Sequence, residues 1–161
     1  MVAAVGCSEE QKREYALPTS LCGIPVPASA LSHLMPTGKQ LTVNEATPVP
    51  DALTTCEASV DGDKVLSVEQ EHRDAGASAY DIARDRFGVK QPKSVRQGSA
   101  AYSDRVAVSV VKCRGGESGD EDITIAVKTV KPAHQDESAM KDLILGYTSA
   151  FEKQQPCSEN S

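Results

Sequence analysis

The sequence predicts an α+β fold, an antiparallel β-sheet with helices packed on it. Three features lead to this prediction: a β-branched hairpin, shorter alternating segments before it, and an amphipathic helix at the end of the chain. In the hairpin, Arg105–Cys113 and Ile123–Val130 alternate with period two, which predicts half-buried strands. The polar segment Arg114–Asp122 between them is too short for a parallel crossover. The strands are therefore expected to be antiparallel and the segment to be a mobile loop.

The N-terminal part of the predicted domain contains one short helix and one strand. A helix is expected over Ala28–Met35, and Pro27 suits its first position because proline has no N–H to leave unpaired. Its apolar face consists of Leu31, Leu34 and Met35. The segment Gln40–Thr47 is predicted to be a strand with Leu41 and Val43 turned inward.

A second hairpin is predicted from Leu53–Val60 and Lys64–His72. A three-residue loop, Asp61–Asp63, is preferred because a strict two-residue Asp-Gly turn would set Glu57 against Leu66. The longer loop places a common set of apolar residues on one face: Cys56, Ala58, Val60, Leu66 and Val68.

A short helix is expected within Asp74–Gly88, with Ser78 or Asp74 as its N-cap. Its inner side is predicted to contain Tyr80, Ala83 and Phe87. The polar stretch that follows contains two weak, short strands, Ser94–Arg96 and Ala100–Ser103, which lead into the central hairpin.

The strongest helical pattern lies in Asp136–Pro156. Apolar residues recur there with a period of 3.6, and Asp136 or Ser138 caps the start. The stripe consists of Met140, Leu143, Ile144, Tyr147, Ala150 and Phe151. It is expected to pack on the sheet, whereas Leu145 falls outside the stripe and is expected to be exposed.

Composition narrows the class of protein. The chain has 161 residues, which suits one domain, and its net charge of -6 without a Lys/Arg block argues against nucleic acid as a partner. Aromatic residues make up 4% with no Trp, so the core must be aliphatic. No apolar run approaches the roughly 20 residues of a membrane-spanning helix.

The five cysteines indicate an oxidising compartment. Their wide spacing, without a CxxC pair, fits disulfides better than a metal site. Cys7 lies in a different kind of sequence and is the unpaired one. The other four allow three pairings. Cys22–Cys157 with Cys56–Cys113 is favoured, because the first pair would hold the terminal helices and the second would join two core strands.

The N-terminus resembles the end of a lipoprotein signal peptide. Small apolar residues precede Cys7 and the composition then turns polar, so residues 1–7 are expected to be a lipobox remnant with a lipidated Cys7. Either the true start lies upstream, or Met1 is an artefact of how the start of the gene was assigned. The alternative is a frayed N-terminus with a free thiol. Residues 8–16 are expected to be a flexible tether, 17–157 a single domain and 158–161 a disordered tail.

Four segments carry a family resemblance: YALPTSLCGIPV, TTCEASVDG, VVKC and AMKDLILGYTSAFEKQQPC. They resemble predicted cell-envelope lipoproteins of actinobacteria, of the kind common in streptomycetes, over most of residues 15–157. The resemblance implies a cell-envelope address and Cys7 as the lipidated position. It implies no catalytic residues and no cofactor.

The chain shows no recognisable catalytic or metal motif. The glycines at 115–119 lead into a strand and lack the Gly-Lys-Ser/Thr of a phosphate loop, and Asp120–Asp122 lack EF-hand spacing. On a strand, Glu69 and Glu71 share one face while His72 points to the other, so these groups do not converge. The other two histidines, His33 and His134, are expected to be solvent-exposed.

Two hypotheses follow. The first is a lipid-anchored or secreted extracytoplasmic domain, non-enzymatic, that binds an unidentified protein or small molecule through the uncovered sheet face or the loop at Arg114–Asp122. The second is a cell-envelope enzyme whose site is assembled from dispersed residues. A deep pocket with a buried titratable group would favour the enzyme, and a broad apolar patch would favour the binding domain.

Overall fold

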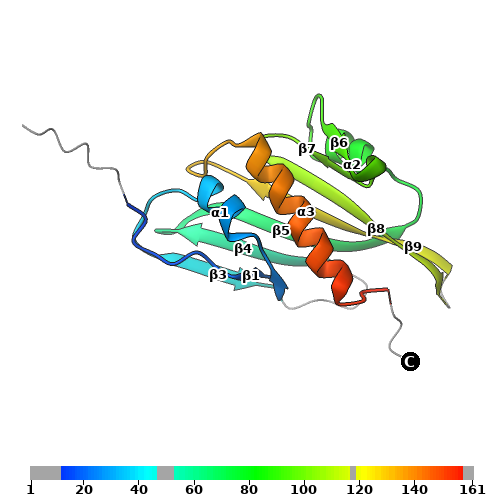
Figure 1. Cartoon of the computed structure of the whole chain (residues 1–161), viewed down its shortest axis with the longest axis horizontal. Coiled ribbons are helices and arrows are strands. Elements are labelled where there is room, and N and C mark those ends of the chain that lie inside the picture. Colours follow the sequence, from blue (N-terminus) through cyan, green and yellow to red (C-terminus); the bar gives the residue numbers. More distant parts are fainter. Residues whose placement is uncertain (1–11, 47–52, 117–118, 158–161) are drawn as a thin grey trace, which may run out of the picture.

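A seven-stranded antiparallel sheet with the strand order β3-β4-β5-β9-β8-β7-β6 forms the centre of the molecule (Figure 1). The computed structural model describes residues 12–46, 53–116 and 119–157. The strands are β3 (Leu41–Glu45), β4 (Thr54–Val60), β5 (Asp63–Asp74), β6 (Lys93–Val95), β7 (Ala100–Tyr102), β8 (Val106–Gly116) and β9 (Gly119–Thr129). The predicted α+β class is confirmed.

The sheet consists of two runs of sequential strands. The first is β3-β4-β5 and the second is β6-β7-β8-β9, and β9 then pairs with β5 from Leu66↔Thr129 to Asp74↔Glu121. A separate small hairpin is formed by β1 (Ser20–Leu21) and β2 (Ile24–Pro25). The last strand in the sequence therefore lies in the middle of the sheet.

Helices cover the two faces of the sheet unequally. Helix α3 (Glu137–Lys153) lies across one face with α1 (Ala28–Leu34) beside it, whereas α2 (Ala79–Asp85) lies by β6, β7 and β8 (Figure 1). The opposite face over β3, β4 and β5 has no described helix. The β7–β8 end of the sheet is therefore a three-layer structure, with α2 and α3 on opposite sides.

The buried face of α3 is the apolar stripe predicted from the sequence. Its largest members are fully buried against the sheet, and the side chain of Asp136 caps the helix by accepting a hydrogen bond from Ala139 N at 2.9 Å. The Tyr147 hydroxyl accepts a bond from Gln70 Nε2 at 2.6 Å and donates one to the carbonyl of Leu21 at 3.2 Å. Burial raises the pKa of Tyr147 well above its ordinary value.

The prediction of half-buried strands is wrong for β8. Its two faces are both covered: Ala107 and Val111 belong to the core beneath α3. Its alternate residues Val106, Val108 and Val110 belong to a second core beneath α2. The inner face of α2 consists of Ala79, Ile82 and Ala83, so Tyr80 and Phe87 lie half-buried at its edge.

The β4–β5 turn combines the two alternatives considered from sequence. It is a two-residue turn, because Val60 pairs with Asp63, and Asp61 and Gly62 both have positive φ. A bulge at Ala58/Ser59 then restores the expected register, in which Ala58 faces Leu66. The expected grouping of apolar residues is correct, while the three-residue loop is wrong.

Several solvent-exposure expectations also change. Leu145 is half-buried and packs against the core, whereas Val43 is 41% exposed on the edge strand β3.

The described part of the expected tether is fixed to the domain. Arg13 donates to the carbonyls of Ser32 and Met35 at 2.8 and 2.9 Å, and Tyr15 donates to that of Pro36.

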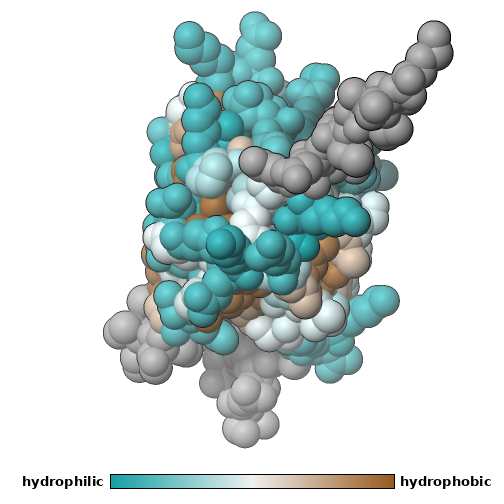
Figure 2. Space-filling view, turned by 90° about the vertical axis from the view of Figure 1, so that its left-hand side faces the viewer, coloured by the Kyte–Doolittle hydropathy of each residue, from teal (hydrophilic) through white to brown (hydrophobic). Residues whose placement is uncertain are grey.

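One end of the molecule has a mainly polar surface. Viewed from the end that carries α1, it is largely hydrophilic, with apolar groups showing as small patches between charged side chains (Figure 2). None of the described helices is long and apolar enough to span a membrane.

The expected disulfide pairing is wrong. The structure joins Cys22 to Cys56 and Cys113 to Cys157, with Cα–Cα distances of 5.6 and 5.2 Å. Strands β5 and β9 lie between β4 and β8. Three strand spacings of about 4.8 Å separate Cys56 from Cys113, which is too far for a disulfide. The two disulfides are consistent with an oxidising, extracytoplasmic environment.

We predict that losing the Cys113–Cys157 bond in a double serine variant lowers the free energy of unfolding by about 3–4 kcal/mol. The bond closes a 44-residue separation and restricts the unfolded chain. Urea denaturation of the oxidised domain measures the loss. Non-reducing peptide mapping should yield a Cys22–Cys56 peptide, and a Cys56–Cys113 peptide would contradict the observed pairing.

Candidate functional site

One main-chain edge of β8 has no described partner strand beyond the point where its neighbour β7 stops. Strand β7 pairs with β8 only as far as Ala100↔Ser109, and the N–H of Val110 then donates to the carbonyl of Ser99 at 2.8 Å. Strand β8 runs on to Gly116 with β9 on its other side. No described strand pairs with the β7-side edge of β8 beyond Val110.

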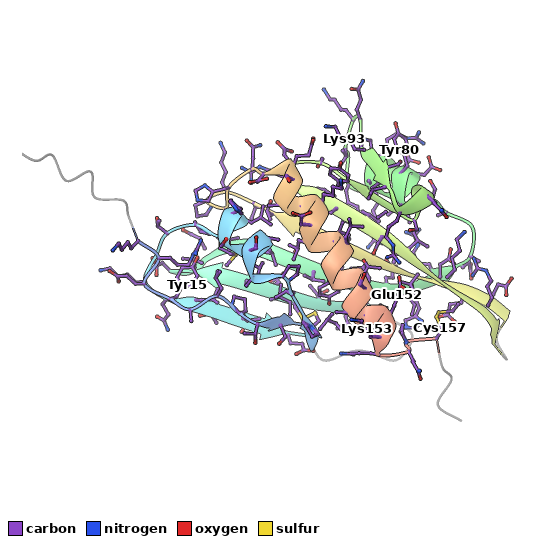
Figure 3. The ribbon with its side chains drawn as sticks, viewed as in Figure 1. Tyr15, Tyr80, Lys93, Glu152, Lys153 and Cys157 are labelled. Atoms are coloured by element: carbon purple, nitrogen blue, oxygen red, sulfur yellow. A yellow bond between two sulfur atoms is a disulfide. The ribbon has the colours of Figure 1, made fainter. Side chains whose placement is uncertain are left out.

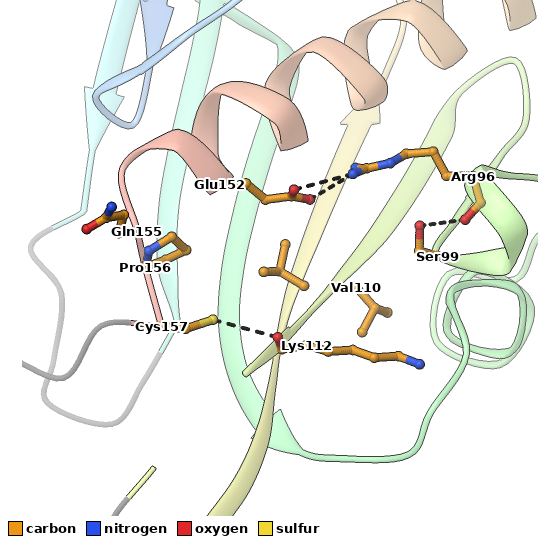
Figure 4. A pocket seen from close by; sticks show the side chains of 9 residues that line it. Arg96, Ser99, Val110, Lys112, Glu152, Gln155, Pro156 and Cys157 are labelled. Atoms are coloured by element: carbon orange, nitrogen blue, oxygen red, sulfur yellow. Dashed lines mark hydrogen bonds and ion pairs between the residues drawn. The ribbon is translucent and has the colours of Figure 1, made fainter. Parts of the chain in front are cut away.

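A cavity of about 400 Å³, here called the α3-side cavity, lies against this edge. Its walls are formed by β8, the turn after β6 and the chain that leaves α3. Its apolar lining is Val110, Val111 and Pro156. Arg96 and Glu152 face each other across it with an N–O distance of 3.0 Å (Figure 4). The lining of this cavity therefore combines apolar side chains with an ion pair.

A second cavity of about 330 Å³, the α2-side cavity, lies at the same edge and is lined partly by residues from the N-terminal end of α2. Ser99, Val110 and Lys112 line both cavities, so the two share a wall. The lining of the α2-side cavity includes the charged residues Arg114 and Asp122. Together the two cavities form one cleft that straddles β8, here called the β8 cleft.

An arginine–aspartate network builds the floor of the α2-side cavity. Arg114 Nη1 donates to Asp122 Oδ1 at 2.9 Å and to the carbonyl of Glu121 at 2.9 Å. The other oxygen of Asp122 accepts from Gly76 N at 3.1 Å. The Asp122 side chain is 4% exposed, so this charge-assisted pair is largely shielded from water. The network ties the loop before α2 to the central hairpin.

A left-handed turn between β6 and β7 forms part of the lining of both cavities. Arg96, Gln97 and Gly98 have φ values of 53°, 54° and 86°, a conformation that costs a non-glycine residue about 1–2 kcal/mol. Both the Ser99 N–H and its hydroxyl donate to the carbonyl of Arg96 and hold the turn. The turn directs Arg96 toward Glu152 and places Gln97 in the α2-side cavity.

The Cys113–Cys157 disulfide fixes the wall on the α3 side. It joins the end of the chain after α3 to β8, and Cys157 Sγ lies 3.8 Å from the carbonyl oxygen of Lys112. Figure 3 shows Glu152 and Cys157 together at this end of α3. Because the cross-link is covalent, the wall keeps its place although the helix has ended.

The acidic segment predicted to be a mobile loop is mostly strand. Strand β9 begins at Gly119, so Glu121 and Asp122 pair with β8 instead of standing free, and Asp122 is buried. The solvated-loop expectation failed because Arg114, on the facing strand, compensates the buried carboxylate. The positions 117–118 between the strands lie outside the described residues.

The histidine and glutamate cluster also separates as expected. His72 pairs with Glu121 on the α3 side of the sheet, whereas Glu69 and Glu71 contact Arg86. His33 and His134 are exposed. Among the described residues, no three His, Cys, Asp or Glu side chains are placed to hold a metal ion. Cys7 lies outside the described residues.

Sequence reasoning missed the β8 cleft because its parts come from five separate segments. Arg96 and Glu152 are 56 positions apart, and their pairing depends on the turn at 96–98. The only local signal was Gly98, which follows a predicted strand and permits a positive φ. Nothing in the local pattern indicated that Arg96 and Gln97 would share that conformation.

We predict that Gln97→Gly stabilises the protein by about 0.5–1 kcal/mol relative to Gln97→Ala, because glycine adopts the left-handed conformation without strain. Thermal and urea unfolding of the two variants measure the difference. At an ordinary helical or strand position alanine would be the more stable of the two, so that result would refute a left-handed turn.

Comparison with protein-family models, with curated proteins and with solved structures finds no match to this chain.

Proposed function

We propose that this protein is an extracytoplasmic binding domain that holds its ligand in the β8 cleft and is attached to the membrane through a lipid on Cys7. The observation that carries the proposal is the cleft itself. Two cavities of about 400 and 330 Å³ meet at one open main-chain edge. Such volumes suit a ligand or a peptide side chain.

The binding interpretation is favoured over the enzyme because the hydroxyl groups in the cleft have structural roles. Ser99 Oγ donates to the carbonyl of Arg96 at 2.8 Å. Ser78 Oγ caps α2, accepting from Asp81 N at 3.0 Å and donating to the Asp81 carboxylate at 2.8 Å. Neither hydroxyl is hydrogen-bonded to a histidine that would make it a nucleophile. The cleft offers shape, charge and main-chain groups, which are the requirements of recognition.

Two observations support the membrane attachment. The small apolar residues before Cys7 match the end of a lipoprotein signal peptide, and the other four cysteines are joined in disulfides. Lipid at Cys7 with a folded domain from about Tyr15 onward gives an arrangement in which the domain stands outside the membrane. The resemblance to actinobacterial cell-envelope lipoproteins agrees with this address.

Chemical-shift mapping tests the binding function. The ¹⁵N-labelled, oxidised domain is titrated with random peptide mixtures, soluble glycan fragments and anionic vesicles. We expect at least one class to shift the amides of Ser99, Val110 and Lys112. The variant Lys112→Glu should lose these shifts, whereas the matched control Lys64→Glu, which changes a lysine on β5 away from the cleft, should keep them. If no class perturbs the cleft, the proposed function is wrong.

Mass spectrometry tests the attachment. We expect protein from membranes of the native host to carry a diacylglyceryl group on Cys7, and Cys7→Ser to release it from the membrane fraction because the lipid chains provide the affinity. An unmodified Cys7 in membrane-derived protein would overturn the lipid anchor and leave the binding proposal intact.

A further inference from the structure

We infer that the ligand of the β8 cleft is an extended peptide segment that adds a strand to the open edge of β8, with an apolar side chain in the α3-side cavity and an acidic side chain in the α2-side cavity. This inference rests on the proposed binding function and names its ligand class. Three observations carry it: a main-chain edge that no described strand pairs with, two cavities on opposite faces of that edge, and a lysine without an ion-pair partner among the described residues.

The edge offers main-chain hydrogen bonds. In an antiparallel sheet, successive residues direct their N–H and C=O groups alternately to the two neighbouring strands. Val110 directs its N–H toward Ser99 on the β7 side, so Lys112 directs its own N–H and C=O to the same side. Cys157 Sγ lies 3.8 Å from the Lys112 oxygen but, being in a disulfide, has no hydrogen to donate. The carbonyl therefore keeps its capacity to accept a bond.

The positions of the two cavities match the side-chain alternation of a strand. Neighbouring side chains of an added strand point to opposite faces of the sheet. At this edge one face opens into the α3-side cavity and the other into the α2-side cavity, and Val110 and Lys112 line both. Two consecutive side chains of a bound peptide would therefore enter one cavity each, as in other complexes that form by strand addition.

The lining of each cavity selects the side chain. The α3-side cavity has Val111 and Pro156 in its lining, and the Arg96–Glu152 ion pair there is already neutralised, so an apolar group fits it. In the α2-side cavity, Arg114 is paired with Asp122, whereas the Lys112 ammonium forms no ion pair with a described carboxylate. A carboxylate on the peptide would supply that partner.

The walls of the cleft favour a single extended chain over a second copy of this protein. The opening is bounded by the Cys157 segment on one side and by the loop at Gly76–Ser78 on the other. A second copy would bring the same two walls to the same narrow edge. A peptide presents only its backbone and alternating side chains there.

The test begins with a random heptapeptide display library panned on the immobilised, oxidised domain. We expect selected peptides to share an apolar residue next to Asp or Glu. In synthetic versions, N-methylation should weaken binding about tenfold or more at alternate positions and little at the positions between, because only alternate N–H groups face β8. Hydrogen exchange should show the Lys112 amide becoming protected on binding.

Two variants separate the main chain from the side chain. Lys112→Pro removes the outward N–H and should abolish binding, whereas Lys112→Ala keeps the N–H and should retain binding to peptides with a neutral residue in place of the acid. If Lys112→Pro does not fold, the N-methyl scan on the wild-type domain decides the question alone.

The outcomes distinguish the peptide inference from the binding proposal. Peptides that bind the cleft without alternating sensitivity to N-methylation would overturn strand addition while leaving the binding function in place. So would a glycan or vesicle that shifts the cleft amides when no peptide does. A concentration-dependent dimer lost in Lys112→Pro would identify a second copy as the occupant and overturn the peptide inference. No binding from any class would refute both.

Discussion

The pairing of β5 with β9 holds the molecule together. These strands belong to two separate runs, β3-β4-β5 and β6-β7-β8-β9, and they form a continuous ladder from Leu66↔Thr129 to Asp74↔Glu121. Without this ladder there would be two separate sheets of three and four strands, and no continuous apolar face would join them. With it, Ile123, Ile125 and Val127 become the central line of the core on which α3 packs.

The cleft follows from a mismatch in strand length. Strands β8 and β9 have 11 residues each, whereas β7 has only three and begins just after the left-handed turn. The sheet therefore has a step where β7 ends. Helix α3 and the Cys113–Cys157 bond close one side of this step, and the Arg114–Asp122 network with the loop before α2 closes the other.

Natural proteins protect exposed strand edges with charges, bulges and covering loops, and this edge shows such features. Lys112 lies on it, and the β8–β9 register shifts between Cys113 and Gly116. Protection against aggregation and recognition of a peptide use the same groups in different ways. What distinguishes this edge is the pair of cavities on its two faces, together with a strained turn whose Arg96 lines one cavity and whose Gln97 lines the other.

The sequence by itself determined the elements whose signals are local. The stripe in 136–156, the β-branched runs around the central hairpin and the α+β class all follow from period and composition, and the cap of the last helix was narrowed to Asp136 or Ser138. The cysteine content likewise indicated disulfides, because four widely spaced thiols without metal spacing have few other uses. These features depend on neighbours along the chain, which are visible in one dimension.

Only the tertiary structure decided which distant groups meet. The partners of Cys22 and Cys113 depend on the order of strands in the sheet, and the interposed β5 and β9 exclude the pairing expected from position in the chain. The burial of Asp122 depends on Arg114 across the hairpin. The cleft depends on where β7 ends relative to β8. Each is a long-range contact whose energy exists only after the sheet has closed, so no local pattern records it.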